Sequence, residues 1–279
     1  IDIGKGTLYT INRVVIMMSK TKILLTNDDS IHAKGLAELW SALKEIADVI
    51  VVAPDRERSA TGHGITMDVP LRAEKAPTFN GKAWVVNGTP ADCVKLAINC
   101  LLKDKPDLVI AGINRGPNLG NDIFYSGTVS GAMEGMILGF PAVAVSVTEY
   151  LNPDYRYAAS FIRKLVPKFL ETGICMDTLL NINVPSLPPQ DIQGVKITRL
   201  GNRKYINSFE TRVDPRGRSY YWLGGDVVDV IDGSSERDTD VASIKGNNVS
   251  ITPIKIDLTN YRAMNTLRDC LGDLTGKED

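Results

Sequence analysis

Two adjacent carboxylates stand at the end of the first strongly apolar segment of the chain. Asp28 and Asp29 follow the run 21–26, whose residues suit a short buried strand. Neighbouring carboxylates repel each other and lose hydration when they are buried. Two interpretations therefore remain open. The pair either caps a helix that begins near Ala33, or it holds a hard divalent cation that removes the repulsion.

Two further polar loops follow apolar segments of the same kind. Residues 54–63 contain Ser59, and residues 112–120 contain Asn114 and Asn118. Each loop taken alone is most simply a turn with a solvated hydroxyl or amide. If the strands before them are parallel, their carboxyl ends share one edge of a sheet. These side chains would then lie near the two carboxylates, so the three loops are more informative together.

A segment of small and hydroxyl residues, Tyr125–Ala132, opens a predicted helix over 126–138. The free N–H groups at such a helix start are accessible to a phosphate, and Ser126, Gly127 and Thr128 would present them. Small residues can equally serve the close packing of a helix on a sheet, and this alternative stays open. The chain has no G-x-x-x-x-G-K-S/T phosphate loop, and no G-x-G-x-x-G follows its first strand. A nicotinamide dinucleotide site is therefore disfavoured.

The elements that must position these residues are short apolar strands that alternate with helical patterns. The predicted strands occupy residues 21–26, 49–53, 83–86, 108–113 and 141–146. They are continuously apolar, as strands covered by helices on both faces are. Apolar residues at helical spacing run from Leu36 to Leu43, and a second helix is expected to open at Thr89-Pro90. The alternation predicts an α/β fold with a doubly wound, mostly parallel sheet.

Beyond residue 200 the pattern changes to that of an antiparallel extension. Residues 204–213 and 219–223 flank Asp214–Gly217, whose Pro and Gly suit a tight turn, and together they predict a β-hairpin. An isolated hairpin cannot bury both of its faces, so we expect it to pack on a partner subunit. Later segments are predicted as a loop, a strand and a helix, at 225–240, 249–254 and 260–271.

Composition argues against several classes of protein. The 279 residues carry 32 Lys and Arg against 33 Asp and Glu, so the basic excess of a dedicated nucleic-acid binder is absent. No apolar run approaches the ~20 residues of a membrane helix, and we expect neither a membrane nor a nucleic-acid polymer as a partner. Two His and no C-x-x-C pair disfavour a zinc site. The 4 Cys are expected to be buried, reduced thiols of a cytoplasmic protein.

Several longer motifs occur in unbroken order from about Lys20 to Leu271. They are Asn27–Asp29, Val52–Arg56 with Arg58–Ser59, Gly88–Val94, Gly112–Gly120, Tyr125–Val129, Leu180–Pro185, Asp214–Gly217 with Tyr221–Trp222, and Ser250–Pro253. This set resembles the stationary-phase survival protein SurE family. The resemblance implies a Rossmann-like core, with a C-terminal hairpin exchanged between the subunits of a dimer or tetramer. It also implies a metal-dependent nucleotidase that releases phosphate from nucleoside 5′- and 3′-monophosphates.

The resemblance also implies roles for individual residues. The metal ligands of the family correspond to four oxygen donors, Asp28, Asp29, Ser59 and Asn114. Oxygen ligands suit a hard cation, so we expect one Mg²⁺ or Mn²⁺ per subunit. We hypothesise that a metal-free oxygen of Asp28 accepts a proton from the attacking water. Phosphate contacts are expected from the helix start and one loop amide, namely Ser126, Gly127, Thr128 and Asn118.

One position departs from the family pattern, because Ser30 stands where members usually have Gly. If the backbone there needs a positive φ, Ser is strained at a cost of about 1–3 kcal/mol. Two alternative functions stay open, the first because of Ser30 and the second because nothing in the loops selects a base. The protein would be a catalytically impaired nucleotide-binding protein, or a phosphatase that prefers polyphosphate or another phosphomonoester.

The chain is predicted to divide into four segments. Residues 1–18 form an N-terminal extension outside the core, since Met17–Lys20 reads like a natural start just before the first strand. Residues 19–200 form the catalytic core. The hairpin extension used for oligomerisation spans 201–255, and a C-terminal helix and tail span 256–279.

Overall fold

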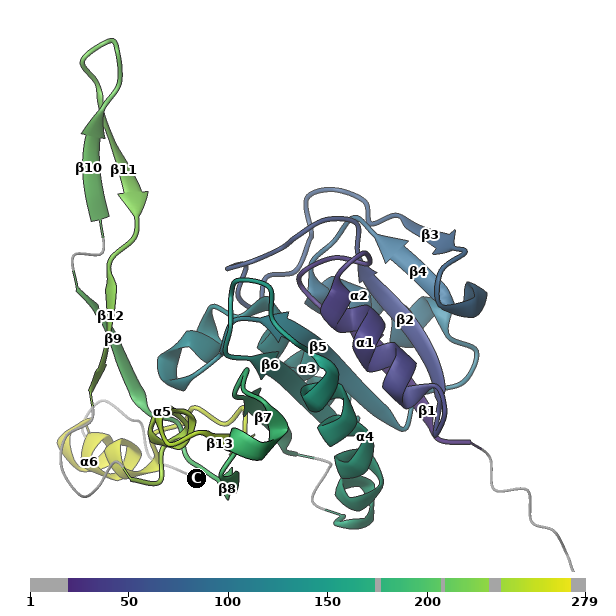
Figure 1. Cartoon of the computed structure of the whole chain (residues 1–279). Coiled ribbons are helices and arrows are strands. Elements are labelled where there is room, and N and C mark those ends of the chain that lie inside the picture. The colour runs from purple at the N-terminus through teal and green to yellow at the C-terminus, as the bar shows by residue number, and fades with distance from the viewer. Residues whose placement is uncertain (1–19, 174–176, 207–208, 231–236, 272–279) are drawn as a thin grey trace, which may run out of the picture.

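The computed structural model describes residues 20–173, 177–206, 209–230 and 237–271, so the predicted extension 1–18 lies outside the described residues. A nine-stranded sheet forms the centre of the molecule. Its strands are β1 (Lys22–Thr26), β2 (Asp48–Pro54), β3 (Ala73–Ala76), β4 (Ala83–Val86), β5 (Leu108–Arg115), β6 (Ala142–Val147), β7 (Leu179–Val184), β8 (Gly194–Ile197) and β13 (Asn248–Ile254). They follow the order β3-β4-β2-β1-β5-β6-β7-β13-β8 (Figure 1).

The middle of the sheet is parallel. Every neighbouring pair from β4 across to β7 runs in the same direction. β3 is antiparallel to β4, and β13 is antiparallel to β7 and parallel to β8. The predicted mostly parallel α/β fold is confirmed. The chain winds from β1 to one side and then returns to place β5 on the other side, so the topological switch point lies between these two strands, where α/β proteins bind ligands.

Two pairs of helices cover the two faces of the sheet (Figure 1). α1 (Lys34–Leu43) and α4 (Arg156–Glu171) bury Leu36, Leu39 and Ile162 on one face. α2 (Pro90–Leu96) and α3 (Gly127–Ile137) bury Val94 and Val129 on the other. The predicted helices near 36–43, after Thr89 and over 126–138 are confirmed. The remaining helical segments are η1 (Phe79–Gly81), η2 (Ala97–Leu101), η3 (Gly120–Phe124), η5 (Pro189–Asp191), α5 (Asp240–Lys245) and α6 (Tyr261–Leu271).

A long hairpin projects from the base of the sheet (Figure 1). Its outer part pairs β10 (Phe209–Val213) with β11 (Ser219–Leu223), and its inner part pairs β9 (Asn202–Ile206) with β12 (Asp226–Val230). The predicted hairpin and its turn at 214–217 are confirmed. The prediction of a loop over 225–240 is wrong in its first part, because β12 forms there. Its three valines favour a strand once β9 lies opposite to pair with it.

The sheet also takes a strand from late in the chain. β13 lies between β7 and β8, although it follows the whole hairpin in sequence and belongs to the segment 201–255 of the predicted division. A buried carboxylate fastens the same region to the rest of the core. Asp240 accepts hydrogen bonds from the backbone N–H of Gly120 at 2.8 Å and of Gly201 at 2.7 Å. Residues after 200 therefore complete the core as well as forming the hairpin.

Among the described cysteines, the prediction of a buried thiol is correct only for Cys93, which is a buried residue of α2. Cys100 and Cys270 are exposed because η2 and α6 turn these positions toward solvent. Cys175 lies outside the described residues. Across the described ranges, no helix is both long and apolar enough to span a membrane.

Candidate active site

The loops after three neighbouring strands meet at the carboxyl edge of the sheet. Asp28 and Asp29 leave β1 beside the switch point. The backbone N–H of Arg58, in the loop after β2, donates to the carbonyl of Asp28 at 2.8 Å. The backbone N–H of Arg115, at the end of β5, donates to Oδ2 of Asp29 at 3.3 Å. Ser59 and Asn114 directly adjoin these two arginines in sequence, so the four predicted metal ligands come from loops joined around one point.

Asp28 also contacts the start of α3. The hydroxyl of Thr128 donates a hydrogen bond to its carboxylate. Gly127 packs directly against it, since a Cβ at Gly127 would lie 2.8 Å from the Cβ of Asp28 and 2.9 Å from its Oδ2. Only a residue without a side chain fits between the helix start and the carboxylate. The structure thus brings the predicted metal site and the predicted phosphate site into contact.

The two carboxylates lie in an unfavourable electrostatic environment. Burial raises the pKa of Asp28 to about 6, with the charge of Asp29 adding to the rise and the hydrogen bond from Thr128 opposing it. Burial also raises the pKa of Asp29, which the neighbouring Arg115 partly offsets. A shift in this direction means that the folded chain disfavours the charged carboxylates. A bound cation would remove that penalty.

The donor atoms around the pair suit a hard cation. Asn114 donates its amide N–H to the carbonyl of Gly116 at 2.8 Å, so Oδ1 is the atom it can offer to a metal. Ser59 is exposed and donates to Glu57 at 2.7 Å. Within the described part of the chain, the buried Oδ1 of Asn27 accepts no hydrogen bond. No three His, Cys, Asp or Glu of the described residues cluster as ligands. The set of two carboxylates, an amide and a hydroxyl fits Mg²⁺ or Mn²⁺ better than zinc.

The helix start is ordered by its own cap. Ser126 is the N-cap of α3, and its hydroxyl oxygen accepts from the backbone N–H of Val129 at 3.0 Å. Ser126, Gly127 and Thr128 are all buried at the carboxyl edge of the sheet. Because the first N–H groups of a helix lack partners within the helix, this start is suited to hold phosphoryl oxygens.

Asn118 has different surroundings from the other predicted phosphate ligands. It is buried, and its side-chain amide donates to the hydroxyl of Ser146 at 2.8 Å. Its backbone carbonyl accepts from the side chains of Asn181 and Asn183 on β7, at 2.8 and 2.9 Å. This network fixes the loop after β5 to its neighbouring strands, and a direct phosphate contact by Asn118 stays a prediction.

Three charged residues of the site carried no predicted role of their own. Arg58 donates through Nη2 to Asp55 at 3.1 Å and to the carbonyl of Asn87 at 2.5 Å, which braces the loop that carries Ser59. Arg115 forms an ion pair with Glu57 at 3.7 Å, so it links the loops after β2 and β5. Arg58 and Arg115 lie within the quoted motifs and Glu57 stands between two motif residues, but charged loop residues are usually solvated, and only the fold shows these contacts.

A second ion-pair cluster fastens the loop that follows Ser59. Glu134 of α3 is buried and lies 2.9 Å from Nε2 of His63 and 2.7 Å from Nζ of Lys95. The hydrogen bond to His63 and the pair with Lys95 together hold the pKa of Glu134 below its usual value. Residues 60–66 are thereby tied to α2 and α3.

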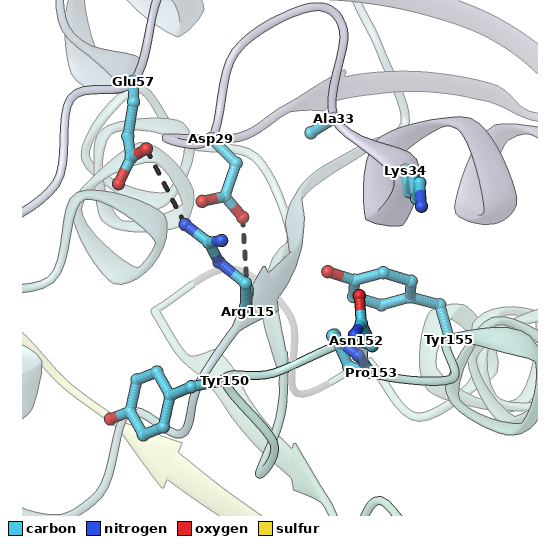
Figure 2. Close-up of a pocket in the computed structure, with 9 residues that line it drawn as sticks. All are labelled: Asp29, Ala33, Lys34, Glu57, Arg115, Tyr150, Asn152, Pro153 and Tyr155. Carbon is cyan, nitrogen blue, oxygen red and sulfur yellow. Dashed lines mark hydrogen bonds and ion pairs between the residues drawn. The ribbon is translucent and has the colours of Figure 1, made fainter.

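A cavity of about 400 Å³ opens beside Asp29 (Figure 2), and none of its lining residues belongs to α3. Its lining includes Arg115, Tyr150, Asn152 and Tyr155, which the sequence did not single out. Three of these residues come from the loop between β6 and α4, which carries no motif.

Ser30 has a φ of +84°, so the condition for strain at this position is met. The amide of Asn27 donates to its carbonyl at 2.8 Å and helps to hold this conformation. The loop therefore keeps its positive φ despite the side chain, and Asp29 keeps its hydrogen bond with Arg115.

Ser30→Gly should stabilise the protein by about 1 kcal/mol, because Gly adopts a positive φ without the steric penalty. For a chain of this size the melting temperature should rise by about 2–4 °C. Urea unfolding of the metal-free protein measures the change. Ser41→Gly, at an exposed position in the last turn of α1, is the matched control and should have the opposite sign. A loss of stability in Ser30→Gly would show that the loop is not strained.

A family model, related sequences and a solved structure all match this chain and carry the same family name. The family model described as "Survival protein SurE" matches residues 23–207. A "5'-nucleotidase SurE" of Heliobacterium modesticaldum is 54% identical over 253 residues, covering 90% of this chain and 92% of the relative. Another, of Carboxydothermus hydrogenoformans, is 51% identical over 261 residues, covering 91% and 98%. The crystal structure of SurE protein from Aquifex aeolicus is 43% identical with a TM-score of 0.78, covering 89% of this chain and 99% of that one.

Proposed function

The chain belongs to the survival protein SurE family, and we propose that it is a phosphomonoesterase that converts nucleoside 5′- and 3′-monophosphates to nucleoside and phosphate. The observation that carries the proposal is the contact of buried Asp28 with both Thr128 and Gly127. It joins a set of oxygen donors suited to a divalent cation with a helix start suited to a phosphate. The relatives described above carry the name 5'-nucleotidase.

One divalent cation, Mg²⁺ or Mn²⁺, is proposed to be held by Asp28, Asp29, Ser59 and Asn114. When bound, such an ion polarises a phosphoryl oxygen and acidifies a water. The remaining chemistry belongs to the chain. An Asp28 oxygen that does not contact the cation is proposed to accept the proton of the attacking water. The Ser126–Thr128 start of α3 is proposed to hold the phosphoryl oxygens as their charge develops.

The test is the release of inorganic phosphate from a panel of nucleoside 5′- and 3′-monophosphates, with Mn²⁺, with Mg²⁺ and with EDTA. We expect release with a cation and a loss to background with EDTA, because the carboxylate pair then lacks its ion. Short polyphosphate and sugar phosphates in the same panel test the alternative specificities. Circular dichroism of the EDTA sample shows whether the chain is still folded.

One second candidate function is favoured by a specific observation. The positive φ of Ser30 strains the loop next to Asp29, so the protein would bind nucleotide without turnover if the strain displaced that carboxylate. Tight nucleotide binding by a folded sample that releases no phosphate from the panel would favour this candidate. Release that requires the cation would exclude it.

The hairpin supports a proposal about assembly. Its outer strands expose large apolar side chains, among them Phe209, Trp222 and Leu223. Because a two-stranded hairpin is marginal alone, we propose that it packs on a second copy in a dimer or tetramer. A monomeric mass from light scattering would contradict this. A cytoplasmic location is also proposed, supported by the free thiols of Cys93, Cys100 and Cys270.

A further inference from the structure

The two adjacent carboxylates of the site face different surroundings. Asp28 contacts Gly127 and Thr128 at the start of α3. Asp29 lines the cavity of about 400 Å³ (Figure 2), whose lining includes neither Asp28 nor a residue of α3. If the phosphate of a substrate lies against α3 and the cation, the rest of the substrate must extend away from α3. The cavity beside Asp29 adjoins one of the two carboxylates and has no α3 residue in its lining, so it can receive that part of the substrate.

The lining of the cavity is suited to a nucleoside. In Figure 2 the hydroxyl of Tyr155 points toward the side where Asp29 and Arg115 lie, and the amide of Asn152 lies beside it. Tyr150 belongs to the lining and is 60% exposed, so its side chain is accessible to a ligand. Aromatic rings stack on nucleobases, and amides read their hydrogen-bonding edges. A volume of this size is within the range of pockets that bind small organic ligands.

The two rings are held in place by the fold. Tyr150 packs on Gly116, where an added Cβ would lie 2.0 Å from its ring. The N–H groups of Tyr150 and Leu151 both donate to the side chain of Glu149, at 2.7 Å each. Tyr155 packs on Gly35, where an added Cβ would lie 3.0 Å from its ring. Gly116, in the loop after β5, and Gly35, on α1, therefore leave space for these two rings. The fold positions both rings without a ligand.

We infer that this cavity is the nucleoside pocket of the enzyme, with the base stacked on Tyr150 and the sugar passing between Arg115 and Tyr155 toward the cation. The inference rests on the proposed function and adds the residues that would separate nucleotides from other phosphomonoesters. It assigns Tyr150 a role in substrate binding and none in bond breaking. Asn152 is the group in the lining that reads the edge of the base.

The test compares adenosine 5′-monophosphate with ribose 5-phosphate, which has the same scissile bond and no base. Tyr150→Leu should raise the KM for the nucleotide by about 5- to 100-fold, the range that loss of one stacking contact produces. The kcat/KM for ribose 5-phosphate should stay within about twofold of the wild type, since it makes no stacking contact. Tyr150→Phe keeps the ring and should restore the KM for the nucleotide. Tyr261→Leu replaces a similarly exposed tyrosine on α6 and is the matched control.

Binding measured without turnover separates this inference from the proposed function. Titration of adenosine 5′-monophosphate into the Mn²⁺-loaded protein by calorimetry should show weaker binding in Tyr150→Leu by the same factor, whether or not phosphate is released. Asn152→Gly removes the amide at a residue with a φ of +52°, where Gly is unstrained, and should change the ranking of bases. Equal losses of kcat/KM on both substrates in Tyr150→Leu would overturn the assignment of this cavity as the nucleoside pocket. An unchanged affinity of this variant for the nucleotide would overturn it as well. A wild type that binds nucleotide but releases no phosphate would overturn only the proposed activity.

Discussion

Asp28→Asn should lower the rate of phosphate release by at least about a thousandfold while leaving the protein folded. The substitution removes a charge proposed to hold the cation and the oxygen proposed to accept the proton, and a general base alone contributes about 10²–10⁴-fold. Asn has the same shape, and its oxygen can still accept the hydrogen bond from Thr128. The measurement is kcat with saturating Mn²⁺, together with circular dichroism. Near-normal turnover would remove Asp28 from the mechanism.

The same substitution should raise the stability of the metal-free protein. The pKa of Asp28 is raised from 3.8 to about 6, so the folded chain binds this proton more tightly than the unfolded chain does. Stability therefore falls as the pH rises from about 4 to about 6, and the deficit, about 3 kcal/mol, persists above pH 6. Asp28→Asn should lack this fall and unfold at a higher temperature than the wild type at pH 7.5 with EDTA.

Mn²⁺ should reverse that ranking, because it stabilises only a chain that binds it. Asp104→Asn is the matched control, since Asp104 is an exposed carboxylate paired with Lys22 at 2.8 Å, at the opposite edge of the sheet. It should change neither turnover nor the effect of Mn²⁺. If Mn²⁺ stabilised Asp28→Asn as much as the wild type, Asp28 would not be a ligand.

Gly127→Ala should lower kcat/KM by about a hundredfold or more. The new methyl group would lie 2.8 Å from the Cβ of Asp28 and 3.2 Å from the carbonyl of Arg58, so the carboxylate or the helix start must move. A displacement of about 1 Å in a catalytic group can cost on the order of 10²-fold. Steady-state kinetics measure the loss. Gly224→Ala, at a glycine whose Cβ would meet nothing within 4 Å, is the control and should be near wild type. Full activity in Gly127→Ala would mean that the contact with Asp28 has no catalytic importance.

The core strands β1, β2, β4, β5 and β6 could be predicted because their signal is local, whereas β7 was not predicted as a strand. Val49–Ala53 and Leu108–Ile113 are continuous apolar runs, and buried parallel strands have this composition. The edge strands β3 and β8 were not recognised, since their residues are partly charged and mostly exposed. β12 was taken for a loop because its pairing with β9 spans a long stretch of chain, and a hairpin partner at that distance leaves no local pattern.

The candidate site also contains residues that the sequence predicts and residues that it does not. Asp28, Gly127 and Thr128 stand in recognisable motifs, and the structure brings them into contact. The side chains that the loop between β6 and α4 contributes to the cavity do not stand in any motif. Tyr150 and Tyr155 belong to an irregular loop, and they face Asp29 only because β6 lies next to β5 in the sheet. For this reason the residues of the proposed chemistry could be predicted from the sequence, and the residues of the proposed nucleoside pocket could not.

The position of β13 constrains how the protein is made. β7 pairs with β13 on one side, and β8 has no other neighbour than β13 within the described sheet. The ribosome adds the whole hairpin before residue 248, at about 5–20 residues per second. During that interval β7 is an unpaired edge of the growing sheet, and such edges are prone to aggregate. The nascent chain therefore passes through a period of several seconds in which the catalytic loops have emerged but the sheet that supports them is incomplete.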